Sequence, residues 1–132
     1  MLIFLYFSTD EPSIPPSLLR ELAVLDHFKI ELIPRKNRFD KSMTLQCSLE
    51  DDGLPEVPAL TVTIPPNYPS VSPICNLNHY HNNNMPFLKS VGKLLSDKLM
   101  RTHWTYSLSL LLTSWEDSVL RAMAKELTSL EE

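Results

Sequence analysis

A run of prolines directly follows a strand-like segment in the middle of the chain. Residues 60–64 alternate apolar and threonine side chains, which is typical of a strand with one buried face. Residues 65–73 then contain four prolines and one tyrosine. Proline lacks a backbone N–H and has a fixed φ, so the strand must end at Ile64 and the next segment is stiff. We expect Tyr68 to anchor this loop on the core, with one partner for its hydroxyl. The loop-defining residues are Pro65, Pro66, Tyr68, Pro69 and Pro73.

Periodic segments surround this loop. Before it, leucines at helical spacing predict a short helix over 16–25, and alternation predicts strands over 27–33 and 43–49. A short fourth strand over 74–77 could follow the loop. From Pro86 the apolar period changes to 3.6, which predicts a helix up to a break at 102–105. Ser107 is a fair N-cap for a second long helix, which we expect to fray from Glu126 onward.

The order of these elements predicts an α+β fold. It consists of a short N-terminal helix, a three- or four-stranded antiparallel sheet, the proline loop and two C-terminal helices that cover one sheet face. The length of 132 residues suits one domain with a single core. We place the domain at 13–127, after an apolar extension at 1–12 and before an acidic tail at 128–132.

Composition excludes several classes of function. The net charge is −4 and no basic stripe is evident, so binding to duplex nucleic acid is disfavoured. The apolar residues 1–7 are too few to span a bilayer and lack the features of a signal peptide. We expect either that the chain is a piece of a longer protein or that its start is misassigned. Two cysteines allow at most one disulfide, and a reducing intracellular setting is the simpler interpretation.

The Tyr-Pro loop resembles the YPxxxP loop of RWD domains and of the related ubiquitin-conjugating enzymes. Residues 54–65 running into Tyr68-Pro69, together with 85–91 and 114–119, more closely resemble the C-terminal domains of subunit 15 of the Mediator complex. The resemblance covers roughly residues 15–123. It implies a non-catalytic module without a cofactor that acts in the nucleus. Such a module would dock onto other Mediator subunits and support regulation of transcription by RNA polymerase II.

Two other classes of function share parts of this pattern. A conjugating enzyme needs a nucleophilic cysteine after the loop, and no cysteine follows Cys75. An RWD-type adaptor in ubiquitin or stress signalling shares the YPxxxP loop but need not share the motifs of the helical half. We interpret the segment around His79 and His81 as a solvated loop rather than a zinc site, because the neighbouring asparagines are poor zinc ligands. We expect no membrane or small-molecule ligand.

The helical half supplies the core and a candidate partner surface. We assign to the core the residues of the apolar stripes: Phe87, Val91, Leu95, Leu112, Trp115 and Val119. Other large apolar residues fall off these stripes: Met100, Leu110, Leu120 and Leu127. We hypothesise that these four bind another protein of the same assembly, with Met100 near the second face of the last helix. Scattered surface leucines explain them equally well.

Overall fold

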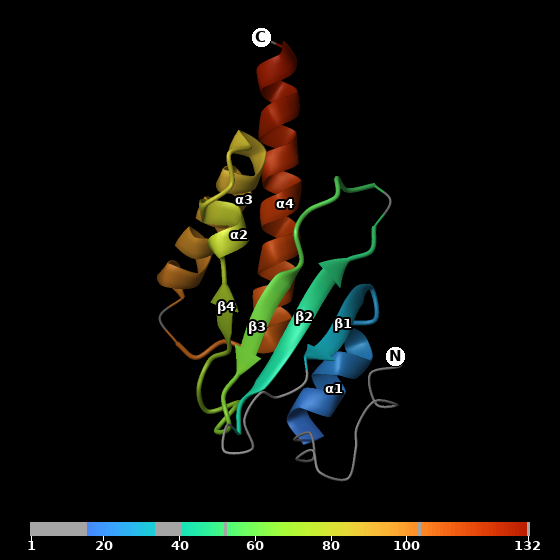
Figure 1. Ribbon diagram of the computed structural model, residues 1–132, viewed down its shortest axis with the longest axis vertical. Helices are drawn as coiled ribbons and strands as arrows, with labels where there is room; N and C mark the ends of the chain where they lie inside the picture. The colour runs from blue at the N-terminus through green and yellow to red at the C-terminus, as the bar shows by residue number, and fades with distance from the viewer. Residues whose placement is uncertain (1–15, 34–40, 52, 103, 132) are drawn as a thin grey trace.

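The computed structural model describes residues 16–33, 41–51, 53–102 and 104–131. Their elements are α1 (Pro16–Val24), β1 (Phe28–Ile33), β2 (Met43–Leu49), β3 (Leu60–Ile64), β4 (Ile74–Asn76), α2 (Asn78–His81), α3 (Pro86–Arg101) and α4 (Leu108–Glu131) (Figure 1). This order confirms the predicted α+β class with a four-stranded antiparallel sheet. The expected extension at 1–12 and the start of the domain at 13–15 lie outside the described residues.

The sheet is an antiparallel meander with the strand order β1-β2-β3-β4. Its register stacks the buried residues of neighbouring strands, so that Ile30 pairs with Cys47 and Leu45 pairs with Val62. The opposite face is polar, because Gln46 lies between Glu31 and Thr61. The alternation in the sequence therefore becomes one apolar face and one face of polar side chains.

The helices complete the core. Figure 1 shows α4 running behind the sheet and continuing past its end. The buried face of α1, with Leu18 and Leu22, joins the same apolar cluster, and α3 packs against α4. None of the helices within the described ranges combines the length and hydropathy needed to cross a bilayer.

Several element boundaries differ from those predicted. α1 ends at Val24 and β1 starts at Phe28, because the Phe28 N–H donates to Leu25 O at 3.1 Å and closes a turn between them. β4 ends at Asn76 rather than at residue 77. α4 remains helical to Glu131, although fraying was expected from Glu126.

The one-turn helix α2 was not predicted, because a solvated loop was expected around His79 and His81. The Asn76 side chain accepts the Asn78 N–H at 2.9 Å and starts the turn. Tyr80 is fully buried, whereas both histidines are exposed. The burial of one aromatic side chain therefore turns an asparagine-rich segment into a helix that packs on α3.

Gly92 allows α2 and α3 to approach closely. A Cβ atom at this buried glycine would lie 2.8 Å from Tyr80 Cβ and 3.3 Å from the His81 ring. Real Cβ atoms do not approach another carbon so closely, so one of the two helices would have to move. The glycine is therefore explained by packing, despite its low helix propensity.

We predict that Gly92→Ala lowers the free energy of unfolding by roughly 1–2 kcal/mol, because overpacking outweighs the usual helix gain of alanine. Urea denaturation would measure the change. Gly53→Ala is the matched control, because its added methyl group meets the exposed Asp51 side chain at 3.3 Å. A Gly92→Ala protein more stable than the wild type would contradict the expectation.

Candidate protein-interaction site

The proline loop forms two successive turns. The Tyr68 N–H donates to Pro65 O at 3.0 Å, and the Ser70 N–H donates to Asn67 O at 2.9 Å. The Tyr68–Pro69 peptide bond is cis. The loop-defining residues are not equally buried: Pro66 and Pro69 are exposed, Pro65 is half-buried, and Tyr68 and Pro73 are buried.

The Tyr68 side chain reaches the start of α4. Its hydroxyl donates to the Glu21 carboxylate of α1 and accepts the Leu108 N–H at 3.0 Å. Burial raises the pKa of Tyr68 well above its usual value, and the hydrogen bond to Glu21 raises it further. The phenol therefore stays neutral and joins α1, the proline loop and α4.

Glu21 also accepts hydrogen bonds from the N-terminus of α4. Its Oε1 accepts both the Ser109 N–H and the Ser109 hydroxyl, each at 3.0 Å. The Ser107 hydroxyl accepts the Leu110 N–H at 3.2 Å, as an N-cap does. The first N–H groups of α4 are thus satisfied, and a carboxylate lies where the helix dipole favours negative charge. Glu21 was not predicted from the sequence. The only sign of its role there is that this carboxylate lies next to the leucine stripe of α1.

A second polar chain crosses the core behind the sheet. Trp115 Nε1 donates to the Tyr80 hydroxyl at 3.0 Å, and that hydroxyl donates to Pro58 O at 2.6 Å. Burial raises the pKa of Tyr80 to about 12. The Trp115 ring also stacks on Phe28, with centroids 6.3 Å apart. Tyr80, which sequence analysis did not assign to the core, therefore connects α2, α4 and the segment before β3.

The predicted core residues lie together. All six are less than a tenth exposed and belong to one apolar cluster: Phe87, Val91, Leu95, Leu112, Trp115 and Val119. The first three lie on α3 and the others on α4, and these two helices pack against each other. Their packing holds the two helices together and leaves the opposite faces of both helices on the outside.

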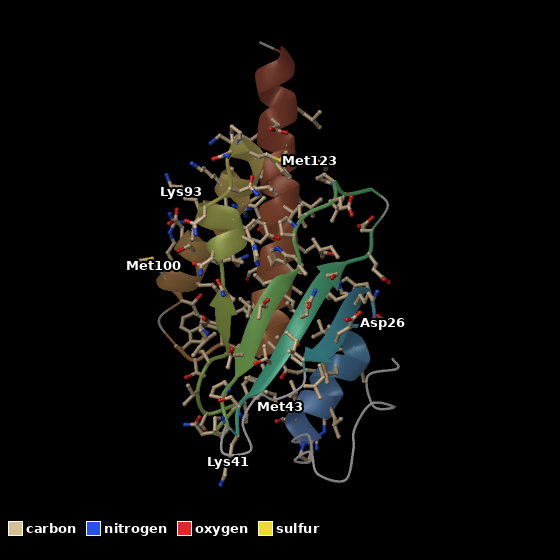
Figure 2. The ribbon with its side chains drawn as sticks, in the orientation of Figure 1. Asp26, Lys41, Met43, Lys93, Met100 and Met123 are labelled. Atoms are coloured by element: carbon tan, nitrogen blue, oxygen red, sulfur yellow. The ribbon has the colours of Figure 1, made fainter. Side chains whose placement is uncertain are left out.

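The predicted partner residues divide into separate groups. Leu120 and Leu127 are exposed and lie seven residues apart on α4, which places them on one face. Leu110 is half-buried in the first turn of α4. Met100 lies about 180° around α3 from the buried Val91, so it points away from α4 (Figure 2). The structure therefore brings Leu120 and Leu127 together but separates Met100 from them.

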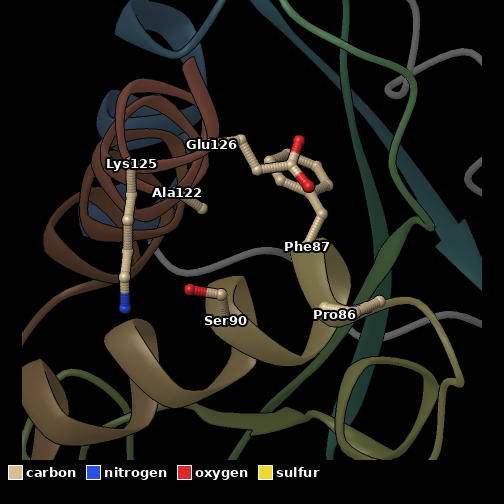
Figure 3. Close-up of a pocket in the computed structure, with 6 residues that line it drawn as sticks. All are labelled: Pro86, Phe87, Ser90, Ala122, Lys125 and Glu126. Atoms are coloured by element: carbon tan, nitrogen blue, oxygen red, sulfur yellow. The ribbon is translucent and has the colours of Figure 1, made fainter. Parts of the chain in front are cut away.

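A small hollow lies between the start of α3 and the far part of α4 (Figure 3). It holds about 190 Å³ and is lined by Pro86, Phe87, Ser90, Ala122, Lys125 and Glu126. In Figure 3 the Glu126 side chain extends over the Phe87 ring, and Lys125 extends along another side of the opening. Sites for small molecules and cofactors usually exceed about 300 Å³, so this hollow is small for either.

The two cysteines lie in environments that do not activate them. Burial raises the pKa of Cys47 to about 12 and also raises that of Cys75, so both free thiols are poor nucleophiles at neutral pH. Within the described ranges, no three His, Cys, Asp or Glu side chains are grouped so that they could hold a metal ion.

Comparison with known proteins decides the family. The model of the C-terminal domain of the ARC105/Med15 mediator subunit matches residues 14–121. The chain belongs to this family. It is 41% identical over 116 residues to the Mediator of RNA polymerase II transcription subunit 15 of Aedes aegypti, covering 87% of this chain and 15% of that protein. The subunit 15 of Homo sapiens is 33% identical over 114 residues, which are 86% of this chain and 14% of that protein.

The Med15 C-terminal domain described here spans about 15% of the length of the curated relatives that it matches. The segments that carried the resemblance meet in its core. The carbonyl oxygen of Pro58, within 54–65, accepts a hydrogen bond from the Tyr80 hydroxyl. The same hydroxyl accepts a hydrogen bond from the side-chain N–H of Trp115, within 114–119. Phe87 and Val91, within 85–91, are buried on α3.

We predict that Tyr68→Ala lowers the free energy of unfolding by roughly 3–5 kcal/mol, the range for loss of a buried aromatic side chain. Tyr68→Phe keeps the ring and removes only the hydroxyl. It should cost about 1–3 kcal/mol, because Glu21 and the Leu108 N–H lose a partner. Thermal and urea unfolding would measure both. A double-mutant cycle with Glu21→Gln should give a non-zero coupling energy, and purely additive effects would show that the two side chains act independently.

We predict that Tyr80→Phe lowers stability at pH 7 by roughly 1–3 kcal/mol, because Pro58 O and the Trp115 N–H lose their partner. The variant should also be less sensitive to alkali. The folded-state pKa of Tyr80 is raised from 10.0 to about 12, so folding favours the neutral phenol. Its contribution is complete below pH 10 and is lost between about pH 10 and 12.

In that interval the wild type should lose up to about 1.4 kcal/mol more stability per pH unit than Tyr80→Phe. Unfolding by urea at a series of pH values would measure the two slopes. Parallel pH profiles for the two proteins would contradict the assignment.

Proposed function

We propose that this domain is a non-catalytic protein-interaction module of a transcription coactivator. It docks into the Mediator complex in the nucleus and supports regulation of transcription by RNA polymerase II. Its partners are other Mediator subunits. Membership of the Med15 C-terminal domain family is the observation that carries this proposal.

The exposed face of α4 is the docking surface in this proposal. Leu120 and Leu127 are 43% and 56% exposed. Burial of a leucine side chain is favourable, so a partner that covers these two side chains would be stabilised by the contact. Figure 1 shows that the far part of α4 continues beyond the sheet. Another protein of the complex can therefore bind this part without displacing the core.

The buried polar contacts support a docking role because they fix α4 in place. Tyr68 and Glu21 hold its first turn, and the Trp115–Tyr80 hydrogen bond holds its middle. An apolar face on a fixed helix loses little conformational freedom on binding, so more of the contact energy contributes to affinity.

The chemistry of the thiols argues against a conjugating enzyme. Thiolate nucleophiles occur where the environment lowers the pKa of the cysteine. Burial instead raises the pKa of Cys75, which lies on β4 just before α2. This side chain is better explained by packing at the sheet edge.

Affinity purification from nuclear extract tests the proposal. The tagged wild-type domain is expected to recover other Mediator subunits, identified by mass spectrometry. A protein carrying Leu120→Asp with Leu127→Asp should recover at least tenfold less, because burying an unpaired carboxylate at an interface is strongly unfavourable.

Val24→Asp is the matched control, because Val24 is 69% exposed on α1, away from the proposed surface. Both variants should keep the circular dichroism spectrum and melting midpoint of the wild type. If the wild type recovers no Mediator proteins, the proposed function is wrong. If Leu120→Asp with Leu127→Asp recovers as much as Val24→Asp, the docking surface lies elsewhere.

A further inference from the structure

The strand β1 forms one margin of the sheet, and β4 forms the other (Figure 1). Within the described ranges, β1 pairs with β2 on one side and with no strand on its outer side. A strand at a sheet margin still has backbone N–H and C=O groups that can pair with another strand. β4 has only three residues, whereas β1 has six, which is the usual length of a paired strand.

The two faces of β1 carry different side chains. Phe28 and Ile30 are buried and belong to the apolar core. The side chains of Lys29 and Glu31 lie on the polar face and are more than half exposed. Lys29 Nζ lies 3.4 Å from Glu31 Oε1. The marginal strand therefore carries one cation and one anion, two residues apart and on the same side of the sheet.

This order of charges makes the outer edge of β1 complementary to a second copy of itself. When two identical strands pair antiparallel around a twofold axis at Ile30, residue 29 of each strand lies opposite residue 31 of the other. Lys29 then faces the second copy's Glu31, and the same contact repeats on the other side of the axis. On the apolar face, Phe28 lies opposite the second copy's Leu32. Opposite charges that face each other directly across two strands stabilise their pairing.

Neighbouring registers are disfavoured by charge or by burial. An axis at Lys29 places two ammonium groups opposite each other, and an axis at Glu31 does the same with two carboxylates. A register displaced by a single residue puts Ile30 opposite a charged side chain, and it joins the apolar face of one sheet to the polar face of the other. Of these registers, the one centred on Ile30 alone suits both faces.

We propose that the outer edge of β1 binds a second copy of this chain. The two β1 strands pair antiparallel around Ile30 and join two four-stranded sheets into one continuous sheet. Each ion pair within a strand is exchanged for a pair across the axis, so no charge loses its partner. A second copy is favoured over an unrelated strand, because only the copy necessarily carries the matching charges at the matching spacing. This edge includes neither Leu120 nor Leu127, so the inference does not depend on the proposed function.

Sedimentation equilibrium of the wild-type chain over a range of concentrations tests the inference. It should show a monomer–dimer equilibrium. The dissociation constant of the dimer should rise as salt is added, because the paired charges are exposed to solvent. A wild-type chain that remains monomeric up to about 1 mM would overturn the proposal.

Charge reversals define the register of the two strands. Lys29→Glu places carboxylates opposite each other on both sides of the axis, and Glu31→Lys does the same with ammonium groups. Each variant alone should weaken the dimer about tenfold or more. An equal mixture of the two variants should recover dimers, because the two carboxylates of one chain then face the two lysines of the other. Neither chain regains its internal ion pair in the mixture, so an effect of that pair on folding does not predict the recovery.

Lys93→Glu and Glu56→Lys are the matched controls, because both positions are exposed outside β1 and the net charge changes by the same amounts. Their dimers should match the wild type within about twofold. Circular dichroism and thermal unfolding establish that each variant is folded. Folded β1 variants that dimerise as tightly as the wild type would overturn the proposal, and so would a mixture that stays monomeric. If Leu120→Asp with Leu127→Asp abolishes the dimer and the β1 variants do not, the second copy binds α4 and the proposal is wrong.

Discussion

The hydrogen bonds between Tyr68, Glu21 and the first turn of α4 determine how the two halves of the domain fit together. The start of a buried helix has N–H groups that no helical carbonyl can accept, and they must find partners elsewhere. Here the phenol of the proline loop accepts one of them, and a carboxylate of α1 accepts another. Three segments that are far apart in the sequence therefore meet at one helix end. This meeting fixes the start of α4 relative to α1 and the proline loop.

The middle of α4 is held by a different kind of contact. The Trp115 ring packs against Phe28, and its one polar atom is satisfied by Tyr80, whose hydroxyl in turn reaches Pro58. Buried polar chains of this kind are favourable only when every member has a partner. All three groups here are paired, so the contact adds directional specificity to the apolar packing. Gly92 makes the arrangement possible, because a larger residue would keep Tyr80 and its helix away from α3.

Most of the fold could be predicted from the sequence because its signals are local. The alternation in β1 to β3 and the leucine spacing in α3 and α4 reflect burial on one face, which is a property of neighbouring residues. The partners of Tyr68 could not be predicted, because Glu21 lies 47 residues away in the sequence and is its neighbour only in the folded domain. α2 escaped prediction because four residues are too few to show a period.

The candidate surfaces were predictable to the extent that a helical wheel describes them. The wheel groups Leu120 with Leu127, since they lie on the same helix. It cannot relate Met100 to them, because the orientation of α3 against α4 depends on long-range packing. Likewise, a net charge of −4 averages over the whole chain and hides the four cationic residues of α3.

The uneven distribution of charge has a consequence for how the molecule approaches other molecules in solution. The helix α3 carries four cationic residues and one carboxylate in a chain of net charge −4, and this uneven spread of charge gives the domain an electric dipole moment. A charged object nearby exerts a torque on such a dipole and turns it before any surfaces touch. Encounters would then begin with a preferred orientation, and their frequency would depend on the ionic strength of the surroundings.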